Sequence, residues 1–66
     1  MKVSLDEQAD ALYIRFEEAK IAESEEVSPG VMLDFDAQGR VVGIEMLNVK
    51  QRLPGADLKR VQVELS

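Results

Sequence analysis

The chain of 66 residues carries 8 basic and 13 acidic side chains and has no cysteine, histidine or tryptophan. So short a chain forms a single domain over residues 1–66, and it has no disulfides or cysteine–histidine zinc sites to stabilise it. Without histidine the usual general base at neutral pH is missing, so we expect a non-enzymatic protein without cofactors. The net charge of −5 repels phosphate backbones and argues against nucleic acid as a partner.

The apolar runs of the chain are short. None of them approaches the roughly 20 residues that a membrane helix requires. The first six residues read MKVSLD and lack the apolar core of a secretory signal. We therefore expect a cytoplasmic protein with no membrane partner.

The first part of the chain alternates apolar and polar residues with a period of two, which is typical of half-buried strands. Residues 2–6 alternate in this way and predict a short first strand, which a polar, turn-rich segment connects to the next. Residues 11–16 predict a second strand, with Leu12, Ile14 and Phe16 on one face.

The stretch over residues 17–28 is rich in glutamate. Glutamate, alanine and lysine favour a helix, but the few apolar residues here form no stripe wide enough to anchor one. A charged edge strand is the preferred interpretation, because acidic side chains on a sheet edge discourage aggregation, and a short helix is the alternative. Pro29 and Gly30 end this segment.

The clearest pattern lies after Pro29-Gly30. Two alternating runs, residues 31–35 and 41–47, are joined by a short connection that contains Gly39. They predict a β-hairpin over 31–47, with Gly39 in the left-handed conformation and forming a bulge. Farther along, residues 56–60 predict one helical turn and residues 61–65 predict a last strand.

These elements together predict a mainly β fold. We expect a small twisted antiparallel sheet, a meander with the central hairpin 31–47 and at most one short helical turn. One face of the sheet is expected to hold Leu12, Ile14, Phe16, Leu33, Phe35, Val42, Ile44 and Met46. Because a single sheet leaves an apolar face to be covered, we expect the chain to form a homodimer.

The second strand and the hairpin also carry a family resemblance. The segments concerned are Asp6, ADALYIRF at 9–16, EEV at 25–27, GV at 30–31, LDFD at 33–36 and GRVVGIE at 39–45. Here the chain resembles the bacterial family of short proteins catalogued as domain of unknown function 2283. The resemblance implies a small β-rich domain and no particular activity. Relatives encoded beside small toxin-like proteins imply an antitoxin-like binding role.

One motif could bind a metal. Asp34, Asp36, Gly39 and Glu45 fall at the spacing of a calcium loop, although Gln38 stands where Asp or Asn belongs. The three carboxylates make a divalent-metal binder or a small hydrolase the alternative to a binding module. On a hairpin, however, Asp36 and Gly39 are turn residues and the other two acids lie on the solvent face, which is the preferred interpretation.

Two further surfaces are candidates for binding. Tyr13 and Arg15 share the outer face of the second strand, where they could hold an anionic group. The acidic stretch is a candidate surface for a basic protein partner, and its simpler interpretation is a solvated edge. Its members are Glu17, Glu18, Glu23, Glu25 and Glu26.

Overall fold

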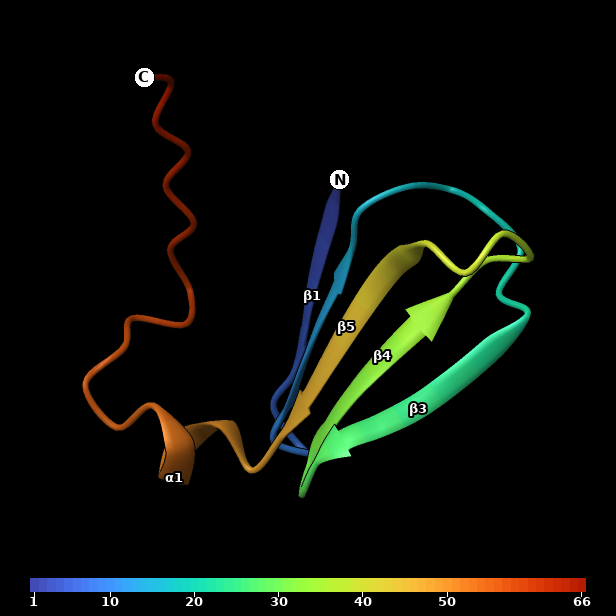
Figure 1. The fold of residues 1–66 in the computed structure, drawn as a ribbon. Helices are drawn as coiled ribbons and strands as arrows, with labels where there is room; N and C mark the ends of the chain where they lie inside the picture. Colours follow the sequence, from blue (N-terminus) through green and yellow to red (C-terminus); the bar gives the residue numbers. More distant parts are fainter.

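The computed structural model describes residues 1–66 and consists of one five-stranded antiparallel sheet followed by a short helix (Figure 1). The strands are β1 (Lys2–Asp6), β2 (Ala11–Arg15), β3 (Glu23–Ser28), β4 (Val31–Phe35) and β5 (Val41–Leu47), and the helix is α1 (Val49–Arg52). The mainly β fold, the hairpin over 31–47 and the single short helical piece are confirmed.

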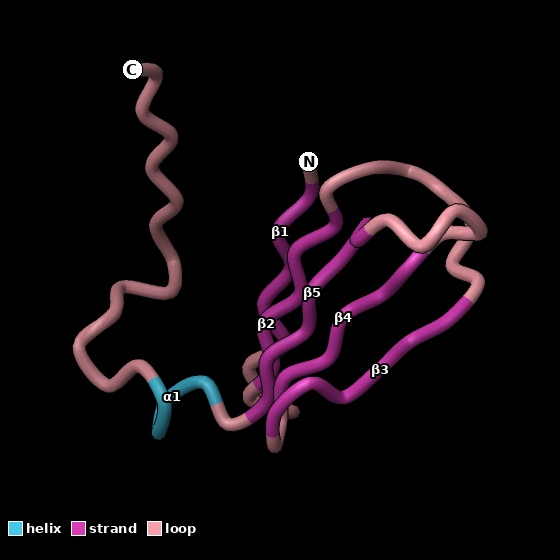
Figure 2. Tube along the Cα trace, viewed as in Figure 1, coloured by secondary structure: helices cyan, strands magenta, loops and turns pink.

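The strands lie in the order β1-β2-β5-β4-β3, with every neighbouring pair antiparallel. The predicted meander is therefore limited to β3, β4 and β5, because β5 pairs next with β2. Residues 16–22 connect β2 to β3 across the end of the sheet, as Figure 2 shows in pink. β5 lies at the centre of the sheet, and its Val42 has the most buried side chain of the sheet.

The registers place the apolar side chains on one side of the sheet. Ile14 lies opposite Ile44, which in turn lies opposite Leu33. The amide of Phe16 extends the ladder by donating to the carbonyl oxygen of Val42 at 2.8 Å. We call this surface the apolar face, and it comprises Val3, Leu5, Leu12, Ile14, Phe16, Val31, Leu33, Phe35, Val42, Ile44 and Met46. The predicted apolar set is thus confirmed on one face.

Most of this face is half-buried: Val42 is fully buried, Val3 and Phe16 are exposed, and the other eight residues lie between these limits. Only four of the 66 residues are fully buried, namely Val42, Val49, Asp36 and Gly43. A compact protein of 7.4 kDa exposes about 4,200 Å². This chain exposes 5206 Å². No second layer packs on the sheet, and Val61, Val63 and Leu65 near the C-terminus are among the most exposed apolar residues of the chain.

The hairpin loop adopts the predicted conformation. Gly39 has φ 78°, a value that L side chains rarely adopt. The register between β4 and β5 shifts between Asp34 and Phe35, so that the partner of Asp34 is Gly43 and that of Phe35 is Val41. This shift leaves Val42 as the extra residue of β5, so it is a separate irregularity from the bulge predicted at Gly39.

The chain after β5 differs from the sequence-based expectation. The structure has neither the helical turn predicted over 56–60 nor the strand predicted over 61–65, and its helix lies at Val49–Arg52 instead. Contacts with distant residues explain this position. The Val49 side chain is fully buried, and its amide donates to the Asp10 carbonyl at 3.1 Å. Arg52 Nε donates to the Leu47 carbonyl at 3.0 Å.

Residues 60–66, which we call the tail, have no strand partner (Figure 1). The apolar residues of the tail are Val61, Val63 and Leu65, and they are 63%, 76% and 97% exposed. The structure contains no helix of sufficient length and hydrophobicity to span a membrane.

Candidate functional site

A hydrogen-bonded group crosses the face of the sheet opposite the apolar face. Tyr13 Oη donates to Asp34 Oδ2 at 2.7 Å, and Ser24 Oγ donates to Asp34 Oδ1 at 2.6 Å. The three side chains come from β2, β4 and β3, so the group ties the two halves of the sheet together across β5.

Gly43 of β5 makes this crossing possible. A Cβ at this position would lie 2.6 Å from Tyr13 Oη and 3.2 Å from Asp34 Oδ2. The alternating pattern alone did not point to this group of residues. The feature that could have revealed it is Gly43, the single glycine within β5, because a glycine inside a strand often marks the close approach of another group.

The tyrosine of this group is kept in its neutral form. The hydrogen bond to Asp34 raises the pKa of Tyr13 above the ordinary value of 10.0, and partial burial raises it further. A raised pKa keeps the phenol protonated as a hydrogen-bond donor, which suits a structural cross-brace rather than a nucleophile or base.

Arg15 is the second residue of the predicted anion-binding spot, after Tyr13. Its guanidinium hydrogen-bonds to backbone carbonyls of the same chain. Its Nε donates to the Glu17 carbonyl at 3.0 Å, and its Nη2 donates to the Ala19 carbonyl. These bonds hold the segment that crosses from β2 to β3. Arg15 also lies near the Tyr13 phenol, where its positive charge opposes the rise in the pKa of Tyr13.

Asp36 organises the hairpin turn. Its Oδ1 accepts from the amides of Gln38 and Arg40, each at 2.9 Å, and its Oδ2 accepts from Arg40 Nε at 2.8 Å. The Arg40 amide, followed by the Arg40 side chain and the Gln38 amide, lowers the pKa of Asp36 below 3.8. The carboxylate is 6% exposed, so its oxygens face the turn rather than solvent.

The three acids of the predicted calcium loop do not converge. Asp34 is bound by Tyr13 and Ser24, Asp36 is enclosed in the turn, and Glu45 lies in the ladder between Tyr13 and Met32. No three His, Cys, Asp or Glu side chains lie close enough together to hold a metal ion. A hairpin lacks the encircling loop of a calcium hand, which is why Asp34, Asp36 and Glu45 do not surround one point, and their separate positions agree with the preferred interpretation.

The acidic stretch is exposed throughout. β3 lies at the sheet edge, as the preferred interpretation predicted, whereas Glu17 and Glu18 lie in the segment that crosses to it. None of the five glutamates forms an ion pair, because the chain's two salt bridges are Arg40–Asp36 and Lys59–Glu7. Glu23 and Glu25 lie opposite Phe35 and Leu33, so they border the apolar face.

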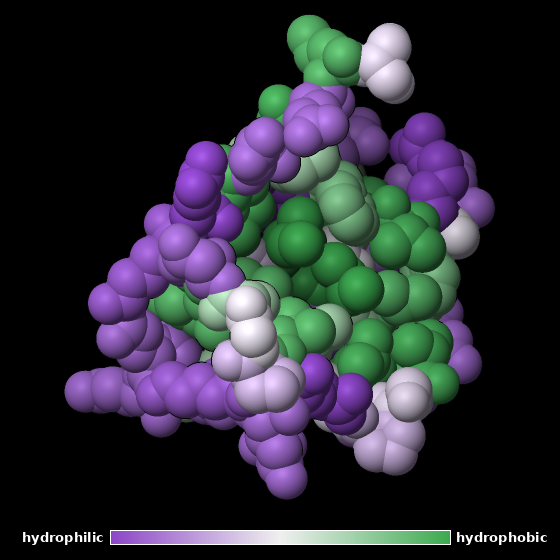
Figure 3. All heavy atoms as spheres, turned by 90° about the vertical axis from the view of Figure 1, so that its left-hand side faces the viewer, coloured by the Kyte–Doolittle hydropathy of each residue, from purple (hydrophilic) through white to green (hydrophobic).

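The apolar face is the largest surface feature. Figure 3 shows hydrophobic side chains gathered over the middle of one side of the molecule, with hydrophilic side chains around them. Apolar patches of this kind, rimmed by polar residues, mark interaction sites in soluble proteins.

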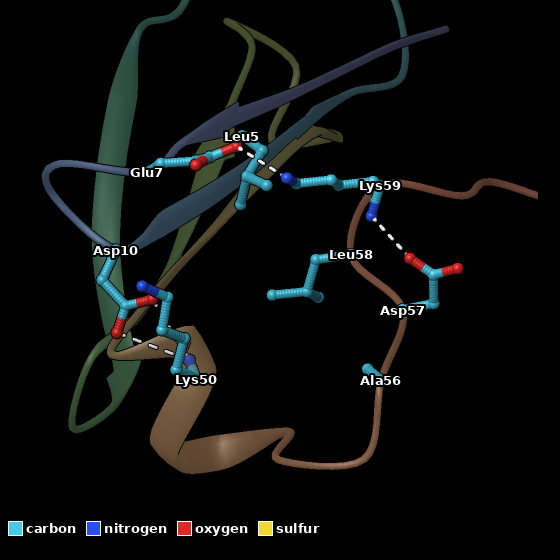
Figure 4. Close-up of a pocket in the computed structure, with 8 residues that line it drawn as sticks. All are labelled: Leu5, Glu7, Asp10, Lys50, Ala56, Asp57, Leu58 and Lys59. Carbon is cyan, nitrogen blue, oxygen red and sulfur yellow. Dashed lines mark hydrogen bonds and ion pairs between the residues drawn. The ribbon is translucent and has the colours of Figure 1, made fainter.

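A cleft of ≈ 390 Å³ separates the β1–β2 end of the sheet from the chain after α1 (Figure 4). Leu5, Glu7, Asp10, Lys50, Ala56, Asp57, Leu58 and Lys59 line it. Its three carboxylates are engaged: Asp10 accepts from the Lys50 amide at 3.2 Å, Asp57 accepts from the Lys59 amide at 3.2 Å, and Glu7 pairs with Lys59 Nζ at 3.8 Å. Each carboxylate of the cleft therefore has at least one partner within the chain.

Comparison with known proteins agrees with the family resemblance. The family described as "Protein of unknown function (DUF2283)" matches residues 2–50, which include all five strands and the first residues of α1. No curated protein and no solved structure matches the chain. The match covers most of the length, and the chain belongs to the family described as "Protein of unknown function (DUF2283)".

Proposed function

We propose that the chain is a non-enzymatic, cytoplasmic binding module that works as a homodimer, with the apolar face covered by the same face of a second copy. The observation that carries this proposal is the lack of any second layer on the sheet. Ile14, Leu33 and Ile44 lie in one cross-strand row of this face, and none of them is fully buried.

Part of the exposed area of the chain belongs to the tail, and the rest leaves room for such an interface. The chain exposes 5206 Å², about 1,000 Å² more than a compact protein of its mass. A standard protein–protein interface covers about 800 Å² on each partner. A two-fold dimer with the same patch on both copies needs no further surface feature, because such an interface is self-complementary.

The dimer is tested by sedimentation equilibrium of the full chain over a range of concentrations. We expect a monomer–dimer equilibrium with a dissociation constant in the micromolar range or below, and twice the monomer mass at high loading concentration. A single species of monomer mass at high micromolar concentration would contradict the proposal.

The dimer in turn presents an acidic surface to a basic protein partner. The support lies in the five unpaired glutamates, two of which, Glu23 and Glu25, stand where β3 borders the apolar face. Charges without an internal partner can steer a basic protein toward this edge and fix its orientation. This interpretation agrees with the antitoxin-like role that the family resemblance implies.

An oligolysine peptide is a suitable probe for the acidic surface. We expect binding that weakens steeply as salt concentration rises, and at least about fivefold weaker binding to a Glu23→Gln/Glu25→Gln variant. The matched control is Glu7→Gln/Glu64→Gln, which removes the same charge elsewhere. Equal losses in the two variants would mean that only net charge matters, and would contradict a defined acidic docking surface.

A further inference from the structure

The two edges of the sheet differ in their chemistry. The β3 edge carries Glu23, Glu25 and Glu26, and charged edges resist pairing with further strands. The β1 edge reads KVSLD, with one charge at each end and a regular alternation of side chains between. The edge of β1 is therefore the one that can accept another strand.

The chain brings its own candidate strand to this edge. Lys59 Nζ lies 3.8 Å from Glu7 Oε1, just beyond the end of β1, and Leu58 is directed into the cleft that Leu5 lines (Figure 4). From this point the tail runs in the direction opposite to β1, toward the level of the N-terminus (Figure 1). The tail can therefore pair with β1 in the antiparallel direction without reversing its course.

The Lys59–Glu7 contact also suggests a register. In an antiparallel pair the residue numbers of opposite residues have a constant sum, so residues 60 to 65 would lie opposite residues 6 to 1. The resulting pairs are Arg60–Asp6, Val61–Leu5, Gln62–Ser4, Val63–Val3, Glu64–Lys2 and Leu65–Met1. Apolar residues oppose apolar residues at three positions, opposite charges meet at two, and two neutral polar residues meet at one.

No neighbouring register matches in this way. A shift by one residue moves Val61, Val63 and Leu65 to the polar face of the sheet, because side chains alternate with a period of two. A shift by two residues places either Val61 opposite Glu7 or Lys59 opposite Leu5.

We infer that the β1 edge is a strand-binding site and that residues 60–65 of the same chain are its occupant, as a sixth strand. In this closed form Val61, Val63 and Leu65 extend the apolar face beyond Val3 and Leu5. The cleft beside β1 shrinks as the tail approaches the sheet. The inference is independent of the proposed dimer, because it concerns the edge of the sheet and not the covering of its face.

Engineered disulfides test the register directly, because the chain has no cysteine of its own. Ser4→Cys/Gln62→Cys places two thiols opposite each other on the polar face. The control Ser4→Cys/Val63→Cys uses the same tail, but its side chains point to opposite faces. A disulfide requires Cα atoms about 4.4–6.8 Å apart and suitably directed Cβ atoms. We expect the first pair to oxidise at least about tenfold faster, to a single-chain product.

Equal oxidation rates for the two pairs would overturn the inference. A product that is mainly a disulfide-linked dimer would overturn it as well, because the occupant would then be another copy. Both altered positions are exposed, and circular dichroism checks that the sheet is retained. As a second measurement, Lys2→Glu should slow oxidation of the first pair, and Glu64→Lys combined with it should restore the rate. Failure of this restoration would also contradict the register.

Discussion

Leu33→Arg is expected to convert the proposed dimer into a monomer and to raise its dissociation constant at least about 100-fold. Leu33 lies in the middle of the apolar face, opposite Ile44 of β5. An unpaired guanidinium enclosed between two such faces loses its hydration without gaining a partner, at a cost of about 3 kcal/mol or more. Sedimentation equilibrium of the variant beside the unmodified chain measures the change.

Met32→Arg is the matched control for this experiment. It places the same side chain on the same strand but on the opposite face, where Met32 lies opposite Glu45. We expect this variant to dimerise like the unmodified chain. If both variants dissociated equally, the effect would come from damage to β4 and the apolar face would not be the interface. Because Leu33 is already partly exposed in the single chain, circular dichroism should show a retained sheet in both variants.

Gly43→Ala is expected to lower the free energy of unfolding by about 1–3 kcal/mol. The added methyl group would lie 2.6 Å from Tyr13 Oη, so the phenol must move and its hydrogen bond to Asp34 is lost or strained. In a domain of this size each kcal/mol corresponds to about 4–8 °C in melting temperature. Thermal and urea unfolding of the variant measure the loss.

A double-mutant cycle identifies the cause of this loss. In a Tyr13→Phe background the oxygen that meets the new methyl group is absent, so Gly43→Ala should cost at least about 0.5–1 kcal/mol less there. Equal costs in the two backgrounds would show that strand conformation, not the Tyr13 contact, requires glycine. Gly55→Ala is the matched control, because nothing lies within 4 Å of its added Cβ, and we expect a change within about 0.5 kcal/mol.

The strands could be predicted because each one obeys a local rule. The period of two in residues 2–6, 11–16 and 31–47 reflects one apolar and one polar face, and the φ of Gly39 follows from the loop that joins two such strands. The position of β3 at an edge followed from its charge alone.

Features that depend on distant residues could not be predicted from the pattern. The helix at Val49–Arg52 has no helical periodicity and depends on Asp10, some 40 residues away in the sequence. The alternating pattern does not determine which strands are neighbours. Several strand orders are compatible with it, so the pairing of β5 with β2 could not be predicted. The sequence suggested an anion site at Arg15. It does not show that the guanidinium of Arg15 donates hydrogen bonds to two backbone carbonyls of the segment that crosses from β2 to β3.

The unequal edges of the sheet limit how far these chains can assemble. For edge-to-edge pairing alone, each chain has a single usable edge, because Glu23, Glu25 and Glu26 discourage pairing at the β3 edge and β1 remains for a new ladder. If the tail is displaced, two β1 edges can pair with each other, and the product then has an acidic strand at both ends. Such a pair cannot be lengthened by adding further strands at its edges, whereas its apolar faces stay available for the proposed face-to-face contact.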